Sequence, residues 1–561
     1  MAEGAQSLRA TVEIDGQQLD SDLRSVLEQI LVDLHLHLPD AFSLTFRDLD
    51  RRVLERARLK IGSKVRISGT ELGGQAIVPL IAAEVTAIEA DYHPRGSRAI
   101  VRGYDASHRM SAGRWTQTYQ NAKDSDLARD VAKRYGLEIG TIDDSGPVLP
   151  HVSQLNVSDW DFLRARAREI GFEAAVSDGK FHFRKPRPAD QAPAAGDYTS
   201  GDPLQLVFGR ELLEFRPRIT AAGQVADVSV RSWDVMTKAA ILHEAKASTT
   251  SVALKNNPAD LAATFGSRRH AVVDRPLATQ AEAEMAASAL SEAIASTWAE
   301  ADGVARGNPM LRAGSAVNIS VVAECFAGRY TLTRTRHVFD QDGYRTHFVV
   351  SGRQERSLLG LTSMGASAGN ASGGSQRIYG LVVAIVTGNA DPKKLGRVKL
   401  KFPWAADLFE SDWARMTQFG AGPNSGAVFL PDVGDEVLVG FEHGDVSHPY
   451  VLGGLYNGKD KPNLGEGLFD DNGTVKRRSF ISRRGHKLIF FDGPGENGVA
   501  IISANGQLKL ELDERNNEVR IFSGAKVIIE AKGDLALKAG GRMEISAGSA
   551  LSVRGSTVSI N

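Results

Sequence analysis

Two histidines, two residues apart, are the first candidates for chemistry in this sequence. His35 and His37 would point to one face of an alternating strand, where imidazole nitrogens can hold a metal ion. No third ligand lies within easy reach along the chain, and histidines of half-buried strands are more common than metal ligands. We therefore predict no metal site, no catalytic residues and no cofactor.

A group of five Lys and Arg side chains between residues 393 and 401 could instead bind the phosphates of a nucleic acid. Few aromatic residues interleave with them, and alternation from Arg397 to Lys401 is typical of a solvated strand face. The glycine-rich segment from Gly365 to Gly374 does not follow a strand and open a helix, so it does not indicate a phosphate loop. The chain carries 67 Lys and Arg against 68 Asp and Glu, which predicts no nucleic-acid partner. The cations are Lys393, Lys394, Arg397, Lys399 and Lys401.

The single cysteine and the N-terminus indicate the compartment. Cys325 cannot form a disulfide within the chain, and its position after an apolar run predicts a buried small side chain. Met1–Ala5 has neither the basic nor the apolar region of a signal peptide. The apolar run Leu381–Val386 is far shorter than the roughly 18 residues of a membrane helix. We expect synthesis in the cytoplasm.

The elements that would position these side chains are mostly strands. Period-two alternation predicts strands, while four-residue spacing of apolar side chains and a serine cap predict helices. Helices are expected at Asp124–Tyr135, from Ser158 to Gly171, and at Gln280–Ala299. Strands are expected at Leu8–Ile14, His35–Leu38, Phe181–Arg184, Val317–Val321 and Thr331–Thr335.

A linker and a barrel follow. Residues 360–376 are rich in Gly and Ser, which indicates a flexible domain boundary. Residues 377–460 contain short strands separated by turn residues, which is typical of a small β-barrel. We expect Leu381, Trp404 and Trp413 in its core. Its predicted strands are Gly380–Val386, Gly396–Phe402, Ala427–Leu430 and Glu436–Phe441.

An eight-residue repeat fills the last part of the chain. Apolar pairs begin at residues 519, 527, 535, 543 and 551, and glycines separate them. Each octad is a short strand with one apolar face, so a lone chain would expose an apolar stripe and unpaired edges. A single-chain β-helix needs roughly 20 or more residues per coil, which exceeds this period. We therefore predict a trimer core made of Val519, Ile521, Val527, Ile529, Leu535, Leu537, Met543, Ile545, Leu551 and Val553.

Motifs in two regions resemble the central spikes of contractile injection machines. The barrel is similar to the OB-fold of VgrG and phage central spike proteins, and the N-terminal part is similar to the phage late-control D hub. The opening segments Val12–Gly16 and Leu38–Asp40 look most like spikes of extracellular contractile injection systems. The other motifs are Gly103–Met110, Ser158–Leu163, Gly328–Tyr330, Gly343–Thr346, Gly396–Trp404, Asp412–Met416, Leu430–Val439, Gly444–Pro449 and Gly453–Gly458.

The resemblance implies a homotrimeric structural spike with an α+β hub of phage-hub-like β-barrels, an OB-fold neck and an intertwined β-prism needle. The implied partners are the inner tube protein, baseplate hub and wedge proteins, a PAAR-type tip protein and cargo effectors, and a membrane would be contacted only through mechanical puncture. The last residues, Val558, Ser559, Ile560 and Asn561, would hold the tip. The expected domains are 1–200 and 201–359 for the hub, 360–376 for the linker, 377–460 for the barrel, 461–497 for a connector and 498–561 for the needle.

Two other functions stay open at this point. Some phage spikes carry a lysozyme domain between barrel and needle, but residues 459–484 are too few for a catalytic domain. This argues against an enzyme, but a cell-wall hydrolase and an OB-type nucleic-acid binder are kept as the two alternatives to a structural spike. Target cell, cargo, tip partner, injection-system subtype and release of the particle cannot be read from the sequence.

Overall fold

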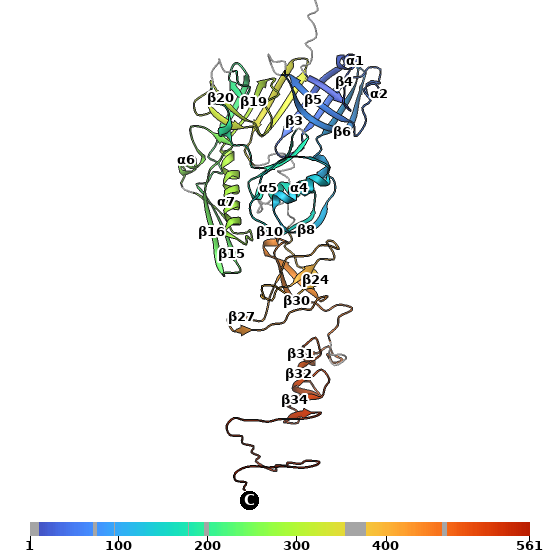
Figure 1. The fold of residues 1–561 in the computed structure, drawn as a ribbon, viewed down its shortest axis with the longest axis vertical. Helices are drawn as coiled ribbons and strands as arrows, with labels where there is room; N and C mark the ends of the chain where they lie inside the picture. The colour runs from blue at the N-terminus through green and yellow to red at the C-terminus, as the bar shows by residue number, and fades with distance from the viewer. Residues whose placement is uncertain are drawn as a thin grey trace, which may run out of the picture. The chain divides into compact units, whose positions relative to one another are not determined.

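A computed structural model describes residues 10–70, 76–94, 96–177, 179–195, 201–266, 268–353, 377–462 and 468–560. The chain forms two compact units, Met1–Leu455 and Tyr456–Asn561. Strands far outnumber helices (Figure 1), which confirms the prediction of a mainly β fold. Within the described ranges, no helix has the length and apolarity needed to cross a bilayer. The predicted linker at 360–376 lies outside the described residues.

One sheet of eleven strands runs through both predicted hub regions. The two regions are joined where two strands, one of each region, Arg334–Asp340 and Leu27–His35, pair antiparallel, with Arg334 opposite His35 and Phe339 opposite Ile30. In order, the sheet contains β14 (Leu212–Ile219), β19 (Ala299–Arg306), β23 (Gly343–Val350), β22 (Arg334–Asp340), β3 (Leu27–His35), β4 (Ala41–Arg47), β7 (Gly96–Tyr104), β6 (Ile77–His93), β5 (Lys64–Thr70), β1 (Ala10–Ile14) and β2 (Gln17–Gln18). The short helices α1 (Ser21–Ser25) and α2 (Val53–Arg56) connect its strands.

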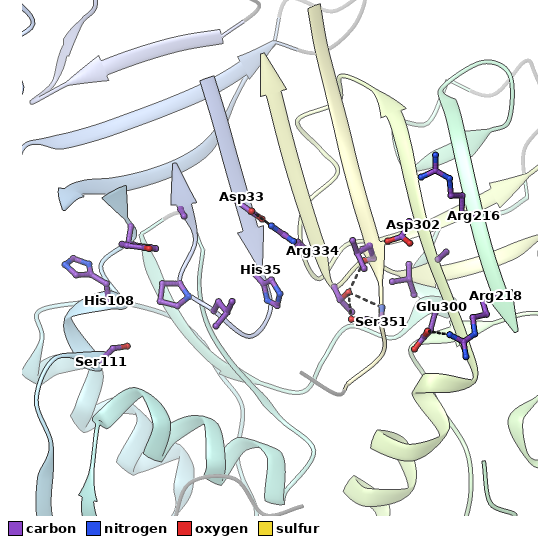
Figure 2. Close-up of a pocket in the computed structure, with 18 residues that line it drawn as sticks. Asp33, His35, His108, Ser111, Arg216, Arg218, Glu300, Asp302, Arg334 and Ser351 are labelled. Carbon is purple, nitrogen blue, oxygen red and sulfur yellow. Dashed lines mark hydrogen bonds and ion pairs between the residues drawn. The ribbon is translucent and has the colours of Figure 1, made fainter. Parts of the chain in front are cut away.

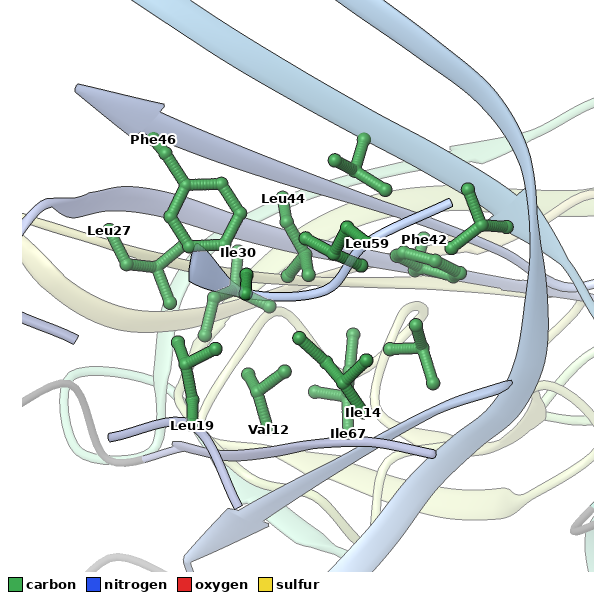
Figure 3. Packing of buried hydrophobic residues seen from close by; sticks show 14 of the residues in the cluster. Val12, Ile14, Leu19, Leu27, Ile30, Phe42, Leu44, Phe46, Leu59 and Ile67 are labelled. Atoms are coloured by element: carbon green, nitrogen blue, oxygen red, sulfur yellow. The ribbon is translucent and has the colours of Figure 1, made fainter. Parts of the chain in front are cut away.

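Strand alternation gives this sheet one buried face and one polar face. Ile30 and Val32 of β3 are fully buried in the first hub core (Figure 3). Burying such a side chain stabilises the fold by roughly 1.5–3 kcal/mol. The intervening residues of β3, including Asp33, must point to the opposite face. The polar face of the hub therefore collects the side chains that line its cavities.

A helical segment is inserted after β7. Its second long helix, α5, begins as predicted: the Ser158 Oγ accepts a hydrogen bond from the Asp161 amide at 3.1 Å. The predicted strand Phe181–Arg184 is confirmed as part of β12. The segment contains α3 (His108–Ser111), β8 (Trp115–Ala122), α4 (Asp124–Arg134), β9 (Glu138–Ile142), β10 (Leu149–Val157), α5 (Asp159–Glu169), β11 (Glu173–Ser177), β12 (Lys180–Arg184) and the 3-10 turn η1 (Ala189–Gln191).

The second hub region packs one long helix, α7 (Gln280–Ala295), against a three-stranded sheet. This helix was predicted to reach Ala299, but a 3-10 turn, η2 (Ser296–Trp298), buries Trp298 and Ala299 starts β19. The other elements are β13 (Gln205–Val207), β15 (Asp227–Asp234), β16 (Ala239–Lys246), β17 (Val252–Ala253), α6 (Pro258–Ala263), β18 (Arg269–Val272), β20 (Ala316–Ser320) and β21 (Gly328–Thr331).

Two predictions in this region are wrong. The expected strand Thr331–Thr335 is split, because Thr331 ends β21 in a four-stranded sheet and Arg334 begins β22 in the eleven-stranded sheet. Cys325 is exposed rather than buried, because it lies in the turn that joins β20 to β21. Alternation and local hydrophobicity could not reveal a change of sheet or the outward turn.

The barrel belongs to the first unit. Its strand β29 matches the prediction residue for residue, whereas Ala427–Leu430 forms no strand. Leu381 and Trp404 are exposed, and Trp413 is only half-buried, so the expectation that all three form the core is wrong. The elements are β24 (Val382–Gly388), β25 (Lys399–Lys401), β26 (Arg415–Met416), β27 (Ala421–Gly422), β28 (Ser425–Gly426), β29 (Glu436–Phe441), the 3-10 turn η3 (Glu442–Gly444) and β30 (Pro449–Gly454).

The second unit begins with a meander of five antiparallel strands, in which each strand pairs with the next one in the chain. The sheet spans Arg477–Ser523, so it crosses the predicted boundary at residue 497 between the connector and the needle. Residues 524–560, which follow it, contain no strand in the single chain. The five strands are β31 (Arg477–Ile481), β32 (Lys487–Gly493), β33 (Glu496–Ile502), β34 (Leu508–Asp513) and β35 (Glu518–Ser523).

Candidate assembly interface

The five-stranded sheet carries an unusually large exposed apolar face. Its register aligns Phe480, Leu488, Ile501, Leu510 and Ile521 across the five strands. Residues directly opposite each other in a ladder share a face, so these side chains form one row. We define the apolar face as Phe480, Leu488, Phe490, Val499, Ile501, Leu508, Leu510, Leu512, Val519 and Ile521.

The opposite face of the same sheet is mixed: charged residues alternate with apolar ones, and Ile489 and Ala500 there are buried. Glu511 of β34 lies directly opposite Arg520 of β35, and Arg477 pairs with Glu496. On the apolar face, by contrast, Val519 and Ile521 are 67% and 63% exposed in the single chain. Isolated apolar residues on a surface are normal, whereas a contiguous apolar sheet face marks an interaction surface. The apolar face is therefore the more apolar of the two, with the ion pair Arg478–Asp492 at its edge, and it is the face more suited to a partner.

The predicted trimer core divides into two parts in the structure. Val519 and Ile521 lie on β35 and end the apolar face. The other predicted positions lie beyond β35 and are 49–68% exposed, without a strand partner in the single chain. The structure therefore gives none of them a binding surface within their own chain. These positions are Val527, Ile529, Leu535, Leu537, Met543, Ile545, Leu551 and Val553.

The predicted tip residues are also exposed. Ile560 is 91% exposed and Val558 is 51% exposed, while Asn561 lies outside the described residues. The sequence interpretation missed the apolar face that precedes residue 519. Its signal was present in the alternations Leu508-Leu510-Leu512 and Val499-Ile501, which have the correct period but lack the eight-residue spacing.

A cavity of about 970 Å³ lies on the polar face of the hub sheet, between the end of β3 and strands β14 and β19 (Figure 2). Asp33 lies in its wall and accepts hydrogen bonds from Arg334 at 2.7 Å and Arg336 at 2.8 Å. Burial alone would raise the pKa of Asp33, but these two guanidinium groups outweigh it and lower the pKa below its usual value. The cavity is thus lined by paired charges.

The paired histidines lie beside this cavity, but they do not share a strand face. Strand β3 ends at His35, so the predicted strand His35–Leu38 is wrong beyond its first residue. The chain turns there, and the His37 amide donates a hydrogen bond to the His35 Nδ1 at 2.9 Å. This bond occupies one of the nitrogens that a metal ion would need. Among the described residues, no three His, Cys, Asp or Glu side chains gather as a metal site.

Three of the barrel's five candidate phosphate-binding cations are paired with carboxylates. Arg397 contacts Asp391 at 2.6 Å, and Lys399 contacts Glu410 at 2.8 Å. Lys401 lies 3.8 Å from Asp407. Hydrogen bonding to Arg397 lowers the pKa of Asp391 far below its usual value, so this carboxylate stays charged beside the cation. The positive stripe is therefore largely neutralised within the barrel.

The barrel and the inserted hub segment contact each other directly. Leu155 of β10 is buried among the barrel's apolar residues. The His151 side chain hydrogen bonds to the Glu410 carbonyl through its Nε2 at 3.0 Å. Burial lowers the pKa of His151, which favours the neutral imidazole at this junction.

One known family model matches the barrel of this chain. The type VI secretion system/phage-baseplate injector OB domain matches residues 382–456. A second family model, the Alg8 N-terminal domain, matches residues 85–341. Its bounds begin inside β6 and end just after β22, so they cut through the eleven-stranded sheet rather than follow a folding unit.

Two relatives from Pseudomonas aeruginosa are type VI secretion system spike proteins. VgrG2a is 31% identical over 144 residues, which cover 24% of this chain and 17% of the relative. VgrG5 is 40% identical over 129 residues, which cover 22% of this chain and 15% of the relative. The match thus spans less than a fifth of the length of either relative.

A comparison of folds finds a similarity that covers most of the chain. A chain of the Francisella PdpA-VgrG complex superposes with a TM-score of 0.54 at 9% identity, covering 92% of this chain and 88% of that chain. Identity this low shows the fold alone. The chain is therefore VgrG-like, with the injector OB domain of type VI secretion systems and phage baseplates set in the fold of a VgrG spike.

Proposed function

We propose that this chain is a structural protein, the homotrimeric central spike of a contractile phage-tail-like injection system. The observation that carries the proposal is the exposed apolar face, which continues into the octad repeat. Both surfaces lack a partner in the single chain, and both would be buried if three chains wound around one axis. Spike proteins are also what the matched relatives are named.

Three copies explain the arrangement of the second unit. Each octad supplies one short strand with an apolar side, so three chains could pair their edges and direct the apolar residues inward. A two-chain arrangement would leave part of such a stripe and its edges open. The proposed needle therefore includes the face from Phe480 to Ile521 as well as the predicted core from Val519 to Val553.

The hub and the end of the chain suggest the partners. Two hub regions in each of three chains would present a pseudo-sixfold ring to a hexameric inner tube and to baseplate proteins. The exposed end residues Val558, Ser559 and Ile560 would hold a PAAR-type tip. Sheath contraction would supply the force that drives the spike through the target envelope. The extracellular subtype, in which cargo effectors would travel with the spike, is proposed only on the resemblance of Val12–Gly16 and Leu38–Asp40, whereas the matched relatives are type VI secretion system spikes.

Electron microscopy of the purified full chain tests the proposal. Particles with threefold symmetry and one elongated end are expected. A population of single chains, or particles with twofold symmetry, would contradict it. A zymogram on purified peptidoglycan, run in parallel, would show no clearing for a structural spike, while clearing by the chain alone would favour the hydrolase.

A further inference from the structure

A two-stranded ribbon extends from the barrel between β26 and β29. We define Gln418–Phe429 as the arm. Its strands β27 and β28 pair antiparallel, and the pairing continues below them because the Ala427 amide donates to the Gly420 carbonyl at 3.3 Å. Residues 421–426 at its end are all exposed. The arm is thus an ordered hairpin, and its tip touches little of its own chain.

The shape of the arm is built into its sequence. The tip contains Pro423, which fixes φ, and Asn424, which has a φ of +56° in the left-handed region that Asn tolerates. Gly426 has a φ of +134°, and a Cβ there would lie 2.1 Å from the Gly420 carbonyl oxygen. The arm base is closed by the Gln418 side chain, whose Oε1 accepts from the Phe429 amide at 3.0 Å. The ribbon is therefore held in one conformation before any partner arrives.

The arm presents an apolar pair on one side. The register that pairs Ala421 with Gly426 places Phe419 opposite Val428, so both side chains lie on the same face of the ribbon. Phe419 is 87% exposed and Val428 is 81% exposed. An isolated two-stranded hairpin is marginally stable in water, and two large apolar side chains at its base add to the cost of exposure. The arm therefore needs a surface that covers this pair.

A matching surface lies on the outside of the same barrel. Val383 of β24 lies opposite Leu438 of β29, and Leu381 directly precedes β24, two residues before Val383. The Trp404 side chain joins them, because its Nε1 donates to the Val383 carbonyl at 3.0 Å. We define the β24 patch as Leu381, Val383, Trp404 and Leu438. Leu381 is 59% exposed and Trp404 is 49% exposed, so the patch is open in the single chain.

The occupant that fits both surfaces is a second copy of this chain. The arm and the β24 patch are different surfaces, and neither covers the other in their own chain. A contact between two different surfaces of identical chains is heterologous, and it leaves no surface unpaired only when it closes into a ring. The barrel leads directly into the second unit at Tyr456. Trimerisation through that unit would hold three barrels at a high effective concentration.

We propose that each arm packs Phe419 and Val428 onto the β24 patch of the next chain, so that three arms are exchanged around the ring of barrels. This inference rests on the proposed trimeric spike. It assigns the exposed Leu381 and Trp404, which the barrel core does not use, to an interface between barrels.

Crosslinking tests which surface receives the arm. A photoreactive p-benzoylphenylalanine replaces Phe419 in the full chain. Isotopically labelled and unlabelled chains are grown separately, mixed under denaturing conditions and refolded together. Crosslinked peptides from 381–404 that join a labelled to an unlabelled chain are expected. Crosslinks confined to one chain, or crosslinks to other regions, would overturn the arm exchange while the trimer itself stands. A single-chain mass for the protein would overturn both the trimer and the arm exchange.

A protease readout tests the patch without altering the arm. Chymotrypsin should cleave after Phe419 slowly in the wild-type trimer, because the arm is covered. The double variant Leu381→Asp, Val383→Asp should be cleaved there about tenfold or more faster while the second unit keeps the trimer together. The matched control is Leu408→Asp, a substitution at a 94% exposed apolar residue of the same barrel outside both surfaces, which should leave the rate unchanged. Equal cleavage rates in the patch variant and the wild type would refute the contact.

Discussion

The substitution Ile521→Asp tests the apolar face most sharply. Ile521 ends the row that crosses all five strands of the second unit, and it is also a member of the octad repeat. It is 63% exposed in the single chain, so an aspartate there should not disturb the fold of the chain. In the proposed trimer the three copies of this side chain would face one another. The variant should therefore fold and fail to trimerise.

The expected magnitude follows from the exposed fraction. Full burial of an isoleucine contributes roughly 1.5–3 kcal/mol, so about two thirds of that, or about 1–2 kcal/mol, is available at each copy on association. Three copies would contribute about 3–6 kcal/mol, which corresponds to about two to four powers of ten in the association constant. Burying three carboxylates adds a penalty of several kcal/mol for each unpaired charge. The combined loss should abolish the trimer at micromolar concentration.

Sedimentation equilibrium of the full chain measures this effect. The matched control is Phe522→Asp, because Phe522 is the next residue of β35, is 47% exposed and lies on the opposite face, beside Lys509. The control should remain trimeric, since it places the same charge outside the apolar face. A trimeric Ile521→Asp variant would refute the assignment of the apolar face, and so would loss of the trimer in both variants alike.

Three further predictions follow from other parts of the chain. Burial raises the pKa of Asp105, whose carboxylate lies beside the buried Asp40, so its stabilising contribution is complete below pH 3.8 and is lost as the pH rises through about 6. Asp105→Asn should reduce the loss of hub stability between pH 4 and pH 7, measured as the urea midpoint at each pH, and the part that remains is assigned to Asp40. Persistence of the full pH dependence in that variant would contradict the assignment. Deleting residues 554–561 should leave a trimer that no longer binds its tip protein in a pull-down, and retained binding would refute the docking site. Cys325 should react with a maleimide in the native protein within the time that a surface thiol needs, whereas reaction only after denaturation would contradict its exposure.

Local signals in the sequence were sufficient where the structure is determined locally. The helix after Ser158 and the strand Glu436–Phe441 could be predicted, because a capping side chain and strict alternation act over a few neighbouring residues. The octad spacing likewise identified Val519 and Ile521 as members of an apolar row. These elements need no information about distant parts of the chain.

Long-range pairing explains what could not be predicted. The segment Thr331–Thr335 alternates like one strand, yet its two ends belong to different sheets, which only the partners of each strand decide. His35 and His37 resemble strand neighbours, but the backbone turns so that one imidazole accepts from the next histidine's amide. Leu381 and Trp404 are apolar in the manner of core residues, and apolarity alone cannot distinguish a core from an interface.

The mass of the purified full chain in solution tests the central claim most directly. Size-exclusion chromatography coupled to light scattering reports this mass without reference to shape. A trimeric spike predicts three times the chain mass of 60.3 kDa at micromolar concentration. A mass equal to one chain would contradict the shared apolar face, the octad core and the proposed needle together.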